Sequence, residues 1–144
     1  VTRTGLSLTS GQTYYFYVKA QNGAGMWSAA GTSDGITVDA SPPTTPAVAD
    51  DGLFQTSLTS LHASWTSTDP QSGIAEYQYA IGTSPTVPAS GFLVPWTSTG
   101  TTPSVTASPV TLAPGQAYYF YVKARNGAGC RSGGGSPSTP NKPS

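Results

Sequence analysis

The residues that could perform acid–base chemistry are few and scattered along the chain. Its six carboxylates fall in predicted turns, linkers or one outward strand position, where water reaches them readily: Asp34, Asp39, Asp50, Asp51, Asp69 and Glu76. General acid–base catalysis needs two groups whose surroundings separate their pKa values. The pattern places no two of these carboxylates in surroundings that would separate their pKa values, so we interpret them as turn-capping and solubilising residues and expect no catalytic residue.

The chain also offers few residues for nucleophilic catalysis or metal binding. His62 is the one histidine and Cys130 the one cysteine. His62 alternates away from Trp65 along a predicted strand, which favours a surface residue, and zinc would need several further ligands. A thiolate at Cys130 would need an activating partner, and only Arg131 is adjacent. We therefore expect no zinc site and no cofactor.

Calcium, phosphate and polyelectrolyte partners are also poorly supported. Asp50 and Asp51 could suggest calcium, but a calcium ion takes six to eight oxygens, so only weak binding there stays open. The Asn22-Gly23-Ala24-Gly25 loop lacks the lysine and the spacing of a phosphate-binding loop. The net charge is zero and 8% of residues are charged, which argues against nucleic acid. No apolar run approaches the roughly 18 residues of a membrane span.

One stretch of the chain occurs twice. Residues 11–28 read GQTYYFYVKAQNGAGMWS, and residues 115–132 read GQAYYFYVKARNGAGCRS, an offset of 115 − 11 = 104 residues. This period matches one β-sandwich domain and exceeds that of a short solenoid repeat. The copies differ only at four pairs of positions: Thr13/Ala117, Gln21/Arg125, Met26/Cys130 and Trp27/Arg131.

Both copies alternate with the period of a strand that buries one face. In the second copy one face carries Tyr118, Phe120, Val122 and Ala124. Aromatic side chains on the other face could stack on sugars or peptides. The candidate binding surface therefore consists of Tyr15, Tyr17, Tyr119 and Tyr121. The alternative, that neighbouring side chains cover these tyrosines, stays open.

The order of strand signals predicts three segments. Residues 1–40 offer the last three strands of a module, ending with a short strand at Ile36, Thr37 and Val38, and a proline-rich linker follows. Residues 41–132 carry six or seven short strands joined by Gly, Pro, Ser and Thr turns, without helical periodicity. This pattern predicts an all-β fold, an antiparallel two-sheet β-sandwich. Residues 133–144 have the composition of a Gly/Ser/Pro-rich linker or tail, so the second module is predicted to lack its final strand.

The chain resembles bacterial fibronectin type III modules over nearly its whole length. Residues 61–65 resemble the second strand of that family with its core Trp65, and residues 77–79 resemble the third. Residues 112–129 resemble the sixth strand and its following loop. The resemblance implies that Tyr14 and Tyr118 are tyrosine corners, whose hydroxyl bonds to the backbone near the preceding turn. The expected core is Trp65, Tyr77, Tyr79, Tyr118, Phe120 and Val122.

These observations predict a non-catalytic module of a larger secreted or surface bacterial protein, with a structural, adhesive or assembly role. The alternative is an accessory glycan-binding or spacer module of a secreted polysaccharide-degrading enzyme. The expected partners are other copies of the repeat, neighbouring domains, or glycan.

A three-strand fragment cannot close a two-sheet core by itself. Ile36, Thr37 and Val38 are therefore a candidate donor strand that would complete the open edge of a neighbouring copy. Copies joined head to tail in this way would form a filament. The alternative, an excerpt from a longer array, stays open.

Overall fold

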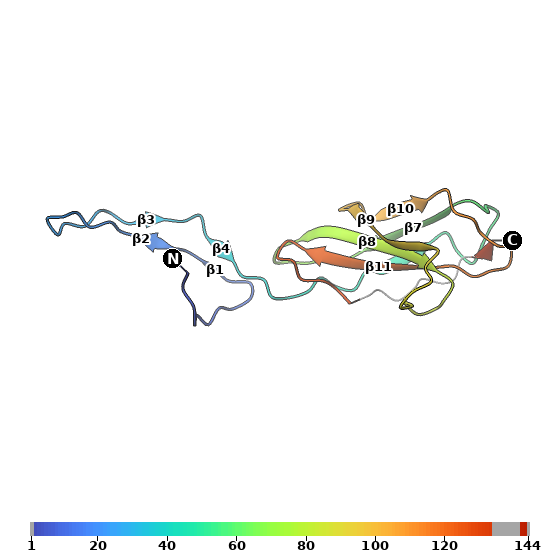
Figure 1. Ribbon diagram of the computed structural model, residues 1–144, viewed down its shortest axis with the longest axis horizontal. Helices are drawn as coiled ribbons and strands as arrows, with labels where there is room; N and C mark the ends of the chain where they lie inside the picture. The colour runs from blue at the N-terminus through green and yellow to red at the C-terminus, as the bar shows by residue number, and fades with distance from the viewer. Residues whose placement is uncertain (1, 134–141, 144) are drawn as a thin grey trace. The chain divides into compact units, whose positions relative to one another are not determined.

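The computed structural model describes residues 2–133 and 142–143 (Figure 1). The chain divides into two compact units, Val1–Ser41 and Pro42–Ser144, here called unit 1 and unit 2. The described residues include no helix long and apolar enough to cross a membrane. Unit 1 contains four short strands: β1 (Thr13–Tyr14), β2 (Tyr17–Val18), β3 (Gly31–Thr32) and β4 (Ile36–Thr37).

Unit 2 is an antiparallel sandwich of two three-stranded sheets, as the sequence predicts. One sheet has the order β10-β7-β5 and the other β11-β8-β9. In Figure 1, β8 and β11 run side by side, and β7 and β10 belong to the other layer. The bounds of these strands are β5 (Ala47–Asp50), β7 (Leu61–Thr66), β8 (Ile74–Gly82), β9 (Val94–Gly100), β10 (Ser104–Ala107) and β11 (Tyr119–Asn126).

Aromatic rings fill the space between the two sheets. The ring of Trp65 stacks on Tyr79 with centroids 6.4 Å apart and meets Tyr77 edge-on at 6.0 Å. Tyr79 also contacts Phe120 at 6.4 Å. Offset and edge-to-face pairs add to the stabilisation that area burial provides. All six expected core residues belong to this buried cluster.

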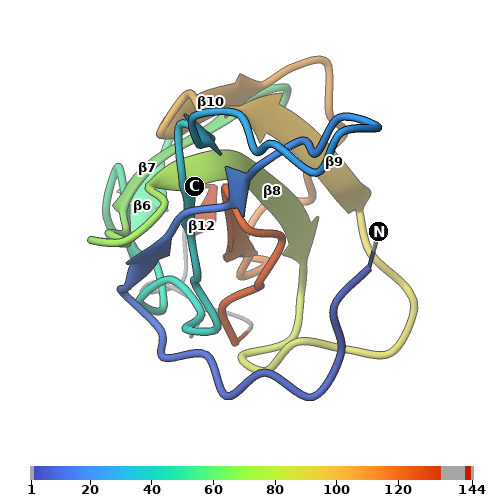
Figure 2. The ribbon, with the colours of Figure 1, turned by 90° about the vertical axis from the view of Figure 1, so that its left-hand side faces the viewer.

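A last short strand lies where the sequence analysis expected linker. β12 (Lys142–Pro143) pairs in parallel with β6 (Phe54–Gln55), and Figure 2 shows the two side by side. The N–H of Gly115 donates to the Pro143 carbonyl at 2.8 Å, as the N–H of Gly11 donates to the Val38 carbonyl at 2.7 Å in unit 1. Pro143 thus accepts the same turn hydrogen bond as Val38, but β12 pairs with β6, whereas β4 pairs with β1 of the repeated segment. A Lys-Pro pair carries no β-branched or alternating signal, so the pattern could not reveal β12.

Unit 1 forms a ladder that is shorter than its sequence suggests. β1 pairs with β4, and β2 pairs with β3, both antiparallel. The equivalent segment in unit 2 contains one continuous strand, β11, because β8 pairs along the whole length of that strand. Ile36 and Thr37, part of the candidate donor strand, pair here with Tyr14 and Thr13 of their own unit. The N–H of Val38 donates to the Gln12 carbonyl at 2.9 Å.

Candidate functional site

Glu76 is engaged in a structural ion pair on the outer face of unit 2. The Nε of Arg125 lies 2.9 Å from a Glu76 carboxylate oxygen, and Gln78 donates to the other oxygen at 3.0 Å. The hydrogen bond from Arg125, with those from Gln78 and Ser98, lowers the pKa of Glu76 from 4.5 to about 2. A carboxylate held ionised this firmly serves poorly as a general acid or base near neutral pH.

Asp69 is buried, contrary to the expectation that every carboxylate is readily solvated. The turn that contains it folds against the end of β11, where Asn126 Nδ2 donates to Asp69 at 3.0 Å. Hydrogen bonds from the backbone N–H of Ser72 and from Asn126 hold the pKa of Asp69 below its ordinary value. The pair joins β11 to the β7–β8 turn and is structural.

The remaining candidates for metal binding, His62, Asp50 and Asp51, have local partners. His62 Nδ1 lies 2.8 Å from an Asp51 oxygen, with both side chains about half exposed. Asp50 accepts a hydrogen bond from the N–H of Gly52 at 3.1 Å. Within residues 2–133 and 142–143, no three His, Cys, Asp or Glu side chains are grouped so that they could hold a metal ion.

The four tyrosines that were predicted to face outward differ in exposure. Tyr121 is fully buried, because Phe92 packs edge-on against its ring at 5.9 Å and its hydroxyl donates to the Ser84 carbonyl at 2.5 Å. Tyr121 is thus excluded from the candidate binding surface, and the alternative that neighbouring side chains cover it is correct there: the connection between β8 and β9 covers the outer face of β11. Tyr119 is half-buried. In unit 1, Tyr15 and Tyr17 are exposed.

We call the repeated segment, residues 11–28 in unit 1 and 115–132 in unit 2, the hairpin. Its inner face is buried in unit 2 and exposed in unit 1. Phe120 and Val122 are 0% exposed, whereas the equivalent Phe16 and Val18 are 53% and 67% exposed. A cavity of about 210 Å³ lies beside this open face, and its lining is largely apolar: Leu6, Leu8, Tyr14, Tyr15, Phe16, Ile36 and Val38. We call this surface of unit 1 the open inner face.

The local framework of the hairpin is the same in both units. The Tyr14 hydroxyl accepts the Thr9 N–H at 3.0 Å, and the Tyr118 hydroxyl accepts the Ala113 N–H at 2.9 Å. Both tyrosine corners therefore form as the resemblance implies. At the other end, the Oδ1 of Asn22 caps the loop in unit 1 by accepting the Met26 N–H at 3.0 Å, as Asn126 does in unit 2.

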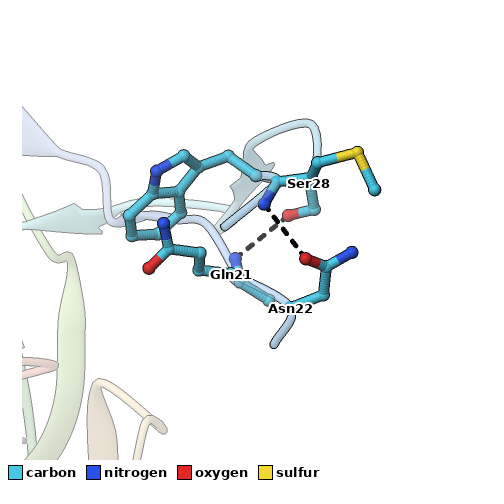
Figure 3. A pocket seen from close by; sticks show the side chains of 6 residues that line it. Gln21, Asn22 and Ser28 are labelled. Carbon is cyan, nitrogen blue, oxygen red and sulfur yellow. Dashed lines mark hydrogen bonds between the residues drawn. The ribbon is translucent and has the colours of Figure 1, made fainter. Parts of the chain in front are cut away.

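A second cavity, of about 340 Å³, lies at the loop end of the unit 1 hairpin, and we call it the tip cavity. Figure 3 shows Gln21, Asn22 and Ser28 around it. The other lining residues are Ala20, Met26 and Trp27. Trp27 is 62% exposed and Met26 is 66% exposed. The sequence analysis did not single out this site, although three of the four differences between the copies mark it.

Comparisons with known proteins agree on the fold. No family model matches the chain. The chain is 33% identical over 136 residues to "Chitinase A1" of Niallia circulans; the match covers 89% of this chain and 17% of the chitinase. A crystal structure of domains A168-A170 from titin matches with a TM-score of 0.51 and 18% identity, over 94% of this chain and 43% of that one. The protein is thus an immunoglobulin- and fibronectin type III-like β-sandwich that is similar to part of a chitinase.

Proposed function

We propose that this chain is a non-catalytic, bacterial fibronectin type III-like part of a larger secreted polysaccharide-degrading protein, where it contacts the polysaccharide or places a neighbouring domain on it. The similarity to Chitinase A1 carries the proposal. The state of the titratable groups supports it, because Glu76, Asp69 and His62 each have a local partner within the fold.

Retention on insoluble polysaccharide tests this role. The full chain is incubated with chitin and, separately, with cellulose, and bound protein and released reducing sugar are both measured. We expect retention on chitin without release of sugar, since a contacting module holds substrate but breaks no bond. Absence of retention on every polysaccharide would contradict a contacting role, and release of sugar would contradict a non-catalytic one.

A second candidate function, assembly by strand complementation, is favoured by the open inner face. In unit 2, strands β7 and β8 cover the equivalent side chains with residues such as Leu61 and Ile81. A second copy of this chain carries the same strands, so its residues 42–107 have the chemistry that fits the open inner face, in exchange for the β11 that covers them within their own sandwich. The donor residues Ile36, Thr37 and Val38 would then add their hairpin to that sandwich.

The loop of unit 1 has a glycine, Gly23, where unit 2 needs Gly127 to let another segment approach closely. A Cβ on Gly127 would lie 2.7 Å from the Ser72 carbonyl oxygen, so glycine is needed there for close approach of the β7–β8 turn. A Cβ on the equivalent Gly23 would meet nothing within 4 Å. Gly23 therefore suits a partner surface like that turn.

Light scattering over a range of concentrations tests assembly. We expect oligomers that grow with concentration and disappear when residues 1–41 are removed. Val18→Asp, which places a charge on the open inner face, should abolish them equally. A monomer at every concentration would contradict this second function and leave the first untouched.

A further inference from the structure

Most of the differences between the two copies of the repeated segment gather at one place in unit 1, the tip cavity. Of the four differences, the three in unit 1 at Gln21, Met26 and Trp27 all line the tip cavity. The fourth, Thr13, lies in β1, where its hydroxyl hydrogen-bonds that of Thr37 at 2.8 Å. Residues that build the hairpin are thus kept, and residues that line its loop end are changed.

The exposure of Trp27 does not depend on what covers unit 1. Gln21 and Trp27 form an antiparallel bridge, so their side chains share the outer face, as Arg125 and Arg131 do in unit 2. Arg131 is exposed although its sandwich is closed. A covering sandwich would therefore leave Trp27 open to solvent. Tyr17 differs, because its counterpart Tyr121 is buried under Phe92.

The change from unit 2 to unit 1 also removes charge and adds a flat apolar surface. Two guanidinium groups are replaced by the amide of Gln21 and the indole of Trp27, and a thiol by the longer thioether of Met26. Met is a residue that adapts to the shape of a ligand. An exposed indole offers a large rigid contact area with few rotatable bonds.

The Gln21 side chain is fixed in place beside the indole. Its Nε2 donates to the Gly25 carbonyl at 3.0 Å, within the loop that Asn22 caps. This orientation leaves the Oε1 of Gln21 to accept a hydrogen bond from a ligand hydroxyl. The cavity thus combines an aromatic face, a polarisable thioether and an oriented acceptor, with no charged residue in its lining.

We propose that the tip cavity is a subsite for one ring of a neutral glycan. A pyranose ring has an apolar C–H face that packs on an indole, and hydroxyl groups at its edge that donate to an amide oxygen. A negatively charged ligand would instead bind better to Arg125 and Arg131, the equivalent residues of unit 2. This inference rests on the proposed polysaccharide contact and assigns it to Gln21, Met26 and Trp27.

The repeat supplies the test, because unit 2 shows which residues the hairpin accepts at each position. Trp27→Arg, Gln21→Arg and Met26→Cys place unit 2 residues in the tip cavity, and Thr13→Ala does the same at the fourth difference, outside the cavity lining. Retention of the full chain on insoluble chitin is measured for each variant, and titration with a soluble N-acetylglucosamine oligosaccharide is followed by tryptophan fluorescence.

We expect Trp27→Arg to weaken binding by about tenfold or more, equivalent to roughly 1.4 kcal/mol, and to remove the fluorescence change. Thr13→Ala should bind as the parent does. Equal retention of the parent and Trp27→Arg would overturn the subsite and leave the proposed function standing. Loss of binding in Thr13→Ala as well would also overturn it, because the loss would then report hairpin folding. A parent chain that is retained on nothing would overturn both the subsite and the contacting role, and would leave only the placing of a neighbouring domain.

Discussion

In unit 2 the charged side chain of Glu76 stabilises the sheet instead of serving in catalysis. Glu76 on β8 and Arg125 on β11 lie on neighbouring strands, and their ion pair spans the sheet at 2.9 Å. Cross-strand pairs of opposite charge stabilise a sheet modestly. Here Gln78 and Ser98 add further hydrogen bonds to the carboxylate and help to hold its negative charge.

The contribution of this ion pair should appear in how the free energy of unfolding changes at acidic pH. The pKa of Glu76 in the folded state, about 2, lies below its ordinary 4.5. Its contribution is therefore fully present above about pH 4.5 and is lost as the pH falls toward about 2. We expect Glu76→Gln to be less stable than the parent at neutral pH and to approach the parent near pH 2. Urea midpoints across this range measure the difference, and a difference that stays constant would contradict the account.

The two tyrosine corners allow a matched comparison. Removing the Tyr118 hydroxyl deprives the Ala113 N–H of its acceptor, which should cost about 1 kcal/mol. Tyr118→Phe should therefore lower the midpoint of thermal unfolding of unit 2, and Tyr14→Phe should leave that midpoint unchanged. Equal melting of Tyr118→Phe and the parent would show that this bond contributes nothing.

At the scale of elements, one sequence adopts two states because its neighbours differ. β11 is a continuous strand since β8 pairs along it and Asp69 and Ser72 hold its end. The equivalent residues 15–22 of unit 1 contain only the two-residue strand β2. Strand length here is set by pairing, which fits the strong context dependence of β-propensity.

The loop after β11 offers a test of this dependence. Ala in place of Gly127 would collide with the Ser72 backbone, and overpacking of this kind costs about 1–3 kcal/mol. Gly127→Ala should therefore destabilise unit 2, as chemical denaturation would show. Gly23→Ala is the matched control and should leave unit 2 unaffected. Equal stability of the two variants would place the β7–β8 turn elsewhere.

Sequence patterning was sufficient where alternation and burial agree. Alternation along residues 118–124 predicted the buried face of β11, and Trp65 was placed correctly in the core. It failed where a distant segment intervenes. The burial of Tyr121 depends on Phe92, which comes from another part of the chain. The tip cavity was missed because a single-strand pattern does not compare the two copies in space.

At the scale of the whole molecule, the chain contains the same hairpin once inside a sandwich and once outside one. Unit 2 has a closed aromatic core between two sheets, whereas the large apolar side chains Phe16, Val18 and Leu8 of unit 1 are about half or more exposed. A hairpin without a packed face is only marginally stable in water. Unit 1 thus exposes its apolar side chains, whereas unit 2 buries the equivalent ones in a closed core.

Amide hydrogen exchange of the full chain, measured by NMR at concentrations where it is monomeric, tests this contrast most directly. Exchange protection follows the free energy of local or global opening. We predict slow exchange along β11, from Tyr119 to Asn126, with protection near the global free energy of unfolding. The equivalent residues 15–22 should exchange rapidly, and gain protection only at concentrations where oligomers form. Equal protection of both segments in the monomer would contradict the account.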